Sequence, residues 1–234
     1  MVYKFDLDIV NGMSKKPYDF KRDTHTKEEL NTLYNELFKE LDINPIKIIE
    51  PHQTHSDNIV CIDESNIDLE FLDTDGAITN LKNVFLVTRE ADCQGILLYD
   101  RKNKVIGNIH SGWKGTLKRI GSKAIDIMIN KYNCNPIDIE VYITPSIQKC
   151  CFEVDSDVYD LYKEEFKDID FSKYVEYKNN KYYIDTQSIN EELFKNKGIK
   201  KVIKSDICTK CNNEFYSYRR DKDSCGRNIS FIML

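Results

Sequence analysis

The stretch Lys104–Ile120, KVIGNIHSGWKGTLKRI, predicts a buried strand that turns directly into a helix. Its first half is mainly apolar and ends on His110, and two glycines flank the turn that follows. The helix is expected to start near Thr116 and to end before Asn133, with its apolar side chains facing a core. His110 therefore lies at the end of a strand, beside a glycine-flanked turn.

Outward from this stretch, the chain alternates apolar runs with segments of helical periodicity. A first helix is expected at Lys27–Leu41, where large apolar residues recur at three- and four-residue spacing. Thr26 and Glu29 fit a capping box that satisfies free N–H groups of the first turn. Two further helices are expected around Ser156–Phe166 and Ser188–Lys195. The alternation predicts an α/β (α+β) fold.

The apolar runs between these helices predict the strands. They are expected at Ile46–Glu50, Asn58–Ile62, Val84–Thr88, Ile96–Tyr99, Lys104–His110, Ile139–Ile143, Lys181–Ile184, Lys200–Lys204 and Asn228–Met233. The loop between residues 84–88 and 96–99 is too short to hold a crossover helix. We therefore expect mixed sheets and not purely parallel ones.

Length and composition indicate one soluble globular domain spanning residues 1–234. The net charge of −5 argues against general nucleic-acid binding, although a local basic pocket for one phosphate remains compatible with it. No apolar run approaches the length of a transmembrane helix, and the first ten residues include acids, unlike a secretory signal. We expect a cytoplasmic monomer whose eight cysteines are reduced.

Three residues on separate turns carry the strongest chemical signal. His55, Cys93 and His110 each lie where a strand-like run ends, and such ends can converge at one edge of a sheet. Two imidazoles and one thiolate supply three zinc ligands and leave a fourth position open, the pattern of a catalytic zinc site. The alternative is that all three are ordinary polar loop residues.

The segments around these residues resemble the signature blocks of one family. The blocks are Gln53–Ser56, Ala91–Cys93, His110–Gly115, Thr144–Val154 and Cys208–Arg227. They resemble the laccase-domain family, also called the multicopper polyphenol oxidase or purine nucleoside phosphorylase family.

The resemblance implies the following properties. His55, Cys93 and His110 would bind zinc, and two packed mixed β-sheets would be flanked by helices in α/β/β/α layers. The activity would be phosphorolysis of adenosine, inosine, guanosine and methylthioadenosine, with adenosine deamination as a second activity. Thr144-Pro145-Ser146 replaces the family's usual Gly-Pro-Ala, which bears on substrate choice and leaves the metal ligands intact.

Other residues near these blocks are candidates for binding and proton transfer. Lys114 precedes a helix N-terminus, a suitable place for an anion, and Arg219 and Arg220 are alternative phosphate-binding residues. Asp92 adjoins a ligand and is a candidate to orient an imidazole or to accept a proton. Each has a structural alternative: a solvated Lys114, an ion-paired arginine, and an Asp92 that caps a turn. Trp113 would stack on a purine or pack in the core.

The remaining cysteines raise a separate question. Cys208-Thr-Lys-Cys211, with Cys225 and the pair Cys150-Cys151, would form a second soft metal site or a redox pair. A structural zinc site usually needs a second CxxC or a pair of histidines. Buried reduced thiols are therefore the favoured interpretation.

Rival functions differ in what they require. A multicopper oxidase needs a cluster rich in imidazole, which four histidines cannot supply, so polyphenol oxidase activity would need copper as a substitute in the zinc site. A metal-independent hydrolase would use Cys93 as nucleophile with His55 or His110 as base. A metal-binding module would have no turnover.

The zinc-deaminase signature HxE…PCxxC is absent, which leaves the general acid/base of a deamination unassigned. We predict a zinc-dependent purine nucleoside phosphorylase.

Overall fold

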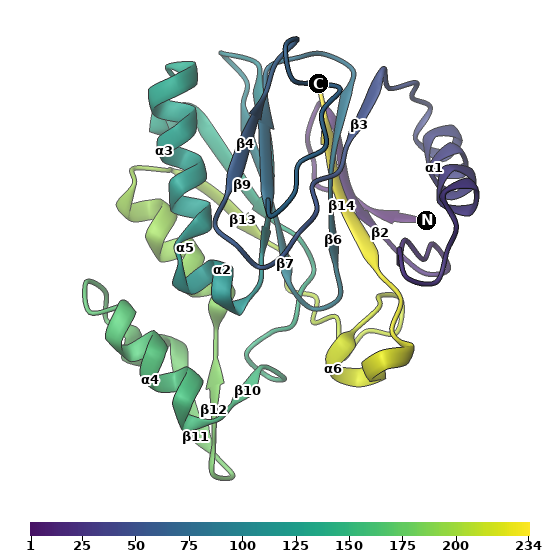
Figure 1. The fold of residues 1–234 in the computed structure, drawn as a ribbon. Coiled ribbons are helices and arrows are strands. Elements are labelled where there is room, and N and C mark those ends of the chain that lie inside the picture. The colour runs from purple at the N-terminus through teal and green to yellow at the C-terminus, as the bar shows by residue number, and fades with distance from the viewer.

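Two large mixed β-sheets form the centre of the computed structural model, which describes residues 1–234 (Figure 1). The five-stranded sheet has the order β1 (Val2–Tyr3), β2 (Val10–Ser14), β14 (Asn228–Met233), β6 (Val84–Glu90) and β3 (Lys47–Ile49). The six-stranded sheet has the order β13 (Lys201–Lys204), β9 (Ile139–Ile143), β7 (Gln94–Asp100), β8 (Val105–Ser111), β5 (Gly76–Thr79) and β4 (Ile59–Ile62).

Both sheets combine parallel and antiparallel pairs, so the prediction of mixed sheets is confirmed. The parallel pairs are β3 with β6, β13 with β9, and β4 with β5. In the centre of the six-stranded sheet, β7 and β8 are antiparallel neighbours that pair Gly95 with His110. All residues of β7 and β8 are buried, because the other sheet covers one face and helices cover the opposite one.

Helices cover the two outer faces. α1 (Lys27–Leu41) lies outside the five-stranded sheet, and α2 (Trp113–Leu117), α3 (Ile120–Tyr132) and α5 (Thr186–Asn196) lie outside the six-stranded sheet (Figure 1). This is the expected α/β/β/α arrangement. A smaller lobe contains α4 (Ser156–Glu165) with β10 (Glu153–Val154), β11 (Val175–Lys178) and β12 (Lys181–Ile184), and α6 (Tyr218–Asp221) precedes β14. Short 3-10 turns occupy Pro136–Asp138, Phe171–Tyr174 and Lys222–Ser224.

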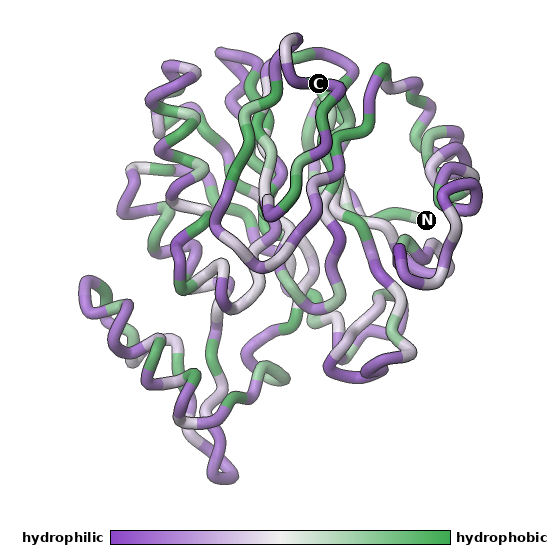
Figure 2. The backbone as a smooth tube through the Cα atoms, in the orientation of Figure 1, coloured by the Kyte–Doolittle hydropathy of each residue, from purple (hydrophilic) through white to green (hydrophobic).

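Apolar side chains fill the space between the sheets. Figure 2 shows hydrophobic residues concentrated along the central strands and hydrophilic residues along the outer loops. The core between the sheets includes Val84 and Leu86 from one sheet and Leu97, Tyr99, Ile106 and Tyr142 from the other. Burial of this apolar surface is the main free-energy gain of folding. None of the helices combines the length and the apolar composition that a membrane crossing requires.

The helix after His110 differs from its prediction. It begins at Trp113, earlier than Thr116, and is interrupted between α2 and α3, where Arg119 adopts a left-handed φ of 57°. The Arg119 guanidinium pairs with Glu165 and Asp168, beside the end of α4. The kink therefore lies where α3 meets residues near the end of α4, a tertiary contact that periodicity does not reveal.

The prediction for α1 agrees with the structure, whereas several short strands were not predicted. The capping box of α1 is confirmed: Thr26 Oγ1 accepts from the Glu29 N–H at 3.2 Å, and a Glu29 carboxylate oxygen accepts from the Thr26 N–H at 2.7 Å. The strands β1, β2, β5, β10 and β11 were not predicted. β2 reads VNGMS and β5 reads GAIT, and neither shows the alternation or the length that marks a strand.

Candidate metal centre and cavity

His55, Cys93 and His110 meet at one end of the six-stranded sheet. Their ligand atoms all lie within 4.8 Å of one another, with Cys93 Sγ 3.9 Å from His55 Nε2. Strand pairing explains two of the three positions, because Cys93 directly precedes β7 and His110 lies near the end of its antiparallel neighbour β8. The loop between β3 and β4 brings His55 to the same place.

Asp75, at the start of β5, organises this centre and was not predicted. Its side chain is fully buried, and one carboxylate oxygen lies 2.7 Å from His110 Nδ1. The same carboxylate accepts from the backbone N–H groups of Thr54, His55 and Ser56. A proton held on His110 Nδ1 leaves Nε2 free as a ligand atom, and such carboxylate–histidine pairs are typical of metal centres.

Electrostatics at the centre favour a thiolate. Burial by itself would raise the pKa of Cys93, but His110 and His55 outweigh it and lower that pKa to about 6. Burial by itself would lower the pKa of His110, but Cys93 and Asp75 raise it to about 10. These shifts favour a thiolate–imidazolium pair in the metal-free protein, and a metal ion would displace the proton on His110 Nε2 while the Nδ1 proton stays on the Asp75 side.

The donor set fits zinc in composition and spacing. The ligand atoms of one tetrahedral zinc ion lie about 3.5 Å apart, close to the sulfur–nitrogen distance of 3.9 Å between Cys93 and His55. One thiolate and two imidazoles leave a fourth coordination position for substrate or water. Gly112 lies against the centre, where a Cβ atom would stand 2.8 Å from His55 Cδ2 and 3.0 Å from Cys93 Sγ.

We expect Gly112→Ala to weaken metal binding by about 10- to 100-fold, since the methyl group must displace ligand side chains. Its φ of −74° suits alanine, so the fold should persist. Competition with a chromogenic chelator measures the metal affinity. Gly115→Ala is the matched control, because its Cβ would come no closer than 3.3 Å to a neighbour, Ile120. Equal affinities in the two variants would contradict this steric account.

A cavity of about 650 Å³ opens over the centre and is strongly basic. His55, Cys93 and His110 all line it. Its cationic lining residues are Lys21, Arg22, Arg89, Arg219, Lys222 and Arg227. Such a concentration of positive charge contrasts with the net charge of −5 and indicates an anionic ligand.

The cations differ in how far their charge is already neutralised. Arg22 and Arg89 both pair with Glu50. Arg219 donates to the carbonyl oxygens of Cys151 and Glu153, which fixes its side chain, and the Glu153 carboxylate is 3.9 Å away. Lys21, Lys222 and Arg227 form no ion pair, and Lys21 Nζ donates only to the Asp223 carbonyl oxygen. They and Arg219 therefore retain most capacity to bind an anion.

Asp92 lines the cavity, but it does not contact either imidazole. One of its carboxylate oxygens accepts from the Thr209 hydroxyl at 2.7 Å, and the other accepts from the Arg219 N–H at 2.6 Å. Asp92 thus anchors the start of α6, as in the turn-capping alternative. The residue that orients His110 is Asp75.

The three residues predicted to bind phosphate, Lys114, Arg219 and Arg220, differ in whether they reach the cavity. Arg219 lines the cavity, whereas Lys114 and Arg220 do not. Lys114 is exposed, with Nζ 5.5 Å from the centre of the Trp113 ring. The Arg220 guanidinium pairs with Asp221 and donates to backbone carbonyl oxygens, including that of Phe215.

Two more lining residues bear on the sequence predictions. Trp113 is half-buried beside the cavity, and His52 is exposed at its wall. Sequence reasoning missed the cationic lining residues other than Arg219, because nothing in their local pattern separates them from solvated surface charges. They are Lys21, Arg22, Arg89, Lys222 and Arg227.

The fold and the site together define a class of mixed α/β protein in which two histidines and one cysteine meet in a basic cavity. Residues 10–234 match the family described as multi-copper polyphenol oxidoreductase laccase, and the chain belongs to this family.

Sequence and structure comparisons with individual proteins are consistent with this family. A purine nucleoside phosphorylase of Bacillus subtilis (strain 168) is 36% identical over 162 residues, which span 68% of this chain and 58% of the relative. A purine nucleoside phosphorylase of Borreliella burgdorferi is 31% identical over 96% of this chain and 93% of its own length. The solved structure of the hypothetical protein YfiH of Bacillus licheniformis has a TM-score of 0.87 and 26% identity, covering 97% of this chain and 92% of that one.

Proposed function

We propose that this protein is a zinc-dependent purine nucleoside phosphorylase. The observation that carries the proposal is a three-ligand centre, His55, Cys93 and His110, that faces a cavity lined by six cationic side chains. A phosphorolytic reaction needs a binding site for phosphate, which the cationic wall offers, and an open metal position would orient or polarise a reactant. The names of the two relatives support the same reaction class.

In this reaction, phosphate attacks the ribose C1′ and the purine departs. Arg219, Lys222 and Arg227 would bind phosphate by charge-assisted hydrogen bonds and orient one oxygen toward C1′. The carbonyl oxygens of Cys151 and Glu153 hold the Arg219 guanidinium in one orientation, so little side-chain entropy is lost on binding.

The nucleoside would occupy the part of the cavity nearest the metal centre. A volume of about 650 Å³ accommodates a nucleoside and phosphate together. The rings of Trp113 and Phe152 line this space and offer faces for stacking on a purine. Bound zinc would supply Lewis acidity toward an oxygen or nitrogen of the substrate. Asp75 keeps the His110 proton on Nδ1 throughout.

Product analysis tests this proposal directly. Purified protein is incubated with adenosine, inosine, guanosine or methylthioadenosine, with and without phosphate. We expect free base and ribose 1-phosphate (or its methylthio analogue) only when phosphate is present. Phosphate-independent release of base would overturn the proposal in favour of hydrolysis, and the same activity in metal-free protein would favour Cys93 as the nucleophile. Adenosine deamination and copper-dependent oxidation of phenols stay predictions from the family resemblance, tested by ammonia release and by assay of copper-loaded protein.

Location and assembly stay predictions too. The sequence favours one domain, a monomer and a cytoplasmic location. Size-exclusion chromatography with light scattering would test the oligomeric state.

Arg219→Gln should raise the KM for phosphate by about 10- to 100-fold. This factor corresponds to the loss of one charge-assisted hydrogen bond, which contributes about 1.5–3 kcal/mol. The metal content should stay unchanged, because Arg219 does not contact the centre. Initial rates at varied phosphate concentration measure the effect. Lys114→Ala is the comparison variant. The variant with the larger increase in KM for phosphate shows whether phosphate binds beside Arg219 or beside Lys114. A larger effect of Lys114→Ala would place the phosphate at the start of α2.

A further inference from the structure

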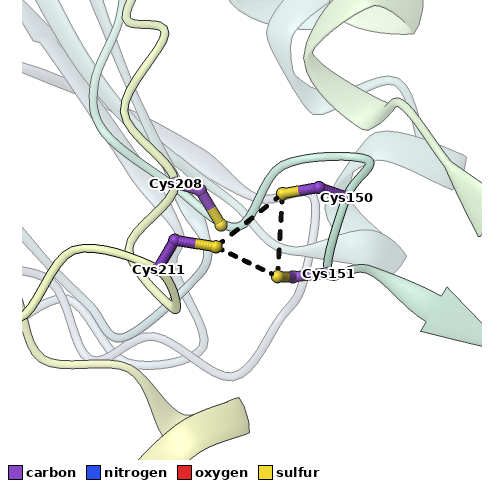
Figure 3. A group of neighbouring side chains, drawn as sticks. All are labelled: Cys150, Cys151, Cys208 and Cys211. Atoms are coloured by element: carbon purple, nitrogen blue, oxygen red, sulfur yellow. Dashed lines mark hydrogen bonds between the residues drawn. The ribbon is translucent and has the colours of Figure 1, made fainter.

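Four cysteines from two distant turns meet outside the His55 centre (Figure 3). Cys150 and Cys151 lie in the turn before β10, and Cys208 and Cys211 lie in the turn after β13. All four sulfur atoms lie within 4.8 Å of one another. The sulfur of Cys151 is 3.6 Å from that of Cys150 and 3.4 Å from that of Cys211, and Cys150 and Cys211 are 4.0 Å apart.

The backbone holds the two turns together without any disulfide. Ser146 and Cys208 form a parallel bridge, and the Thr209 N–H donates to the Ser146 carbonyl at 3.1 Å. The Cys211 N–H donates to the Cys208 carbonyl at 3.1 Å, and the Cys151 N–H donates to the Gln148 carbonyl at 2.9 Å. All four cysteines are free thiols. The four sulfurs are therefore brought together by the fold itself.

The spacing of three of the sulfurs matches a tetrahedral tetrathiolate site, and Cys208 Sγ lies within 4.8 Å of them. Zinc–sulfur bonds of about 2.3 Å place the four sulfurs about 3.8 Å apart. The three separations among Cys150, Cys151 and Cys211, from 3.4 to 4.0 Å, bracket this value. Four sulfur ligands with no open position are the set of a structural zinc site, in contrast to the three-ligand centre.

This arrangement corrects the sequence-based interpretation in two ways. Cys150 and Cys211 are exposed, so the group is not a set of buried thiols. Cys225 is buried elsewhere, with its sulfur 3.2 Å from the Gly226 carbonyl oxygen, and does not join the group. The adjacent pair Cys150-Cys151 supplies the second half of the site, although adjacent cysteines lack the CxxC spacing.

We propose that Cys150, Cys151, Cys208 and Cys211 bind a second, structural zinc ion. The site would join the turn before β10 to the turn after β13. It also adjoins the cavity: the Cys151 carbonyl accepts from Arg219, and the next residue, Phe152, lines the cavity wall. Four thiolates and one zinc ion carry a net charge of −2, and Lys149 and Lys210 place positive charge beside these cysteines in the sequence.

Metal counting on the full chain tests this site. Protein purified under reducing conditions is analysed by inductively coupled plasma mass spectrometry after a brief chelator wash. We expect about two zinc ions per chain in the wild type, and about one in either Cys93→Ala or the double variant Cys150→Ser with Cys211→Ser. The two serines replace exposed residues, so the fold should survive, which circular dichroism checks. Cys61→Ser is the matched control and should keep both ions.

Cobalt substitution supplies an independent readout. In the Cys93→Ala background the only clustered thiols are those of the second site, so cobalt should give the strong sulfur-to-metal charge-transfer absorption of a tetrathiolate. Adding Cys150→Ser and Cys211→Ser should abolish it. The proposal is overturned by wild-type protein with one zinc ion that Cys93→Ala removes entirely, or by a metal-free disulfide among these cysteines. Iron in place of zinc would overturn the zinc assignment. Because counting needs no nucleoside turnover, this result is separable from a failure of the proposed phosphorylase activity.

Discussion

Cys93→Ala and His110→Ala should each eliminate the metal ion of the His55 centre and, with it, nucleoside turnover. Cys93 supplies the only thiolate of this centre, and the Asp75 carboxylate orients His110. Two remaining ligands bind zinc too weakly to retain it through purification. We expect kcat/KM to fall by about 10³-fold or more, equivalent to about 4 kcal/mol of transition-state stabilisation. Metal analysis and the phosphorolysis assay are made on the same preparations.

The controls separate loss of metal from loss of fold. Cys61→Ala changes a cysteine of β4 outside both sulfur-containing sites and should preserve metal content and turnover. Thermal melting of each variant reports the integrity of the fold. Full activity in Cys93→Ala, or in wild-type protein stripped of metal, would refute the metal-dependent mechanism.

Asp75→Asn should produce the largest loss of stability. The buried Asp75 carboxylate accepts from the backbone N–H groups of Thr54, His55 and Ser56, from the Ser56 hydroxyl, and from His110 Nδ1. An asparagine has one acceptor oxygen, and its NH₂ group would face donors that then lack a partner. Breaking a buried charged network of this kind costs about 3–5 kcal/mol. Urea denaturation measures the free energy of unfolding.

The same substitution should weaken metal binding by about 10- to 100-fold, since His110 loses the group that orients it. Asp73→Asn is the matched control, because Asp73 lies in the same loop but is exposed. We expect it to change the free energy of unfolding by less than about 1 kcal/mol. If Asp75→Asn behaved like Asp73→Asn in both measurements, Asp75 would have no organising role.

Local sequence was enough to predict the elements whose formation depends on neighbours along the chain. α1 has the predicted bounds, Lys27–Leu41, since helical periodicity and a capping box act within a few residues. Strand β9, Ile139–Ile143, and strand β14, Asn228–Met233, also match their predictions, because long apolar runs mark buried strands. The three candidate zinc ligands were identified because the segments around them resemble the signature blocks of the family.

Contacts between residues far apart in the chain were not predicted. Asp75 reads in sequence as one more acidic loop residue, and its role appears only where β5 lies beside β8. Arg219 and Arg220 are indistinguishable in sequence, yet the fold turns one into the cavity and places the other against backbone carbonyl oxygens. Strand order and loop paths decide such contacts.

By itself, the sequence determined the mixed α/β class, the main helices and strands, and the identity of three candidate ligands. The class and the elements follow from side-chain periodicity and from hydrogen bonds between residues close along the chain, and the ligands follow from the resemblance of the segments around them to the family's blocks. Only the tertiary structure decided that Asp75 orients His110, that a basic cavity covers the centre, and that four cysteines form one group. The physical reason is that these features depend on distances between turns far apart in the chain, which are set when the two sheets pack and exclude water.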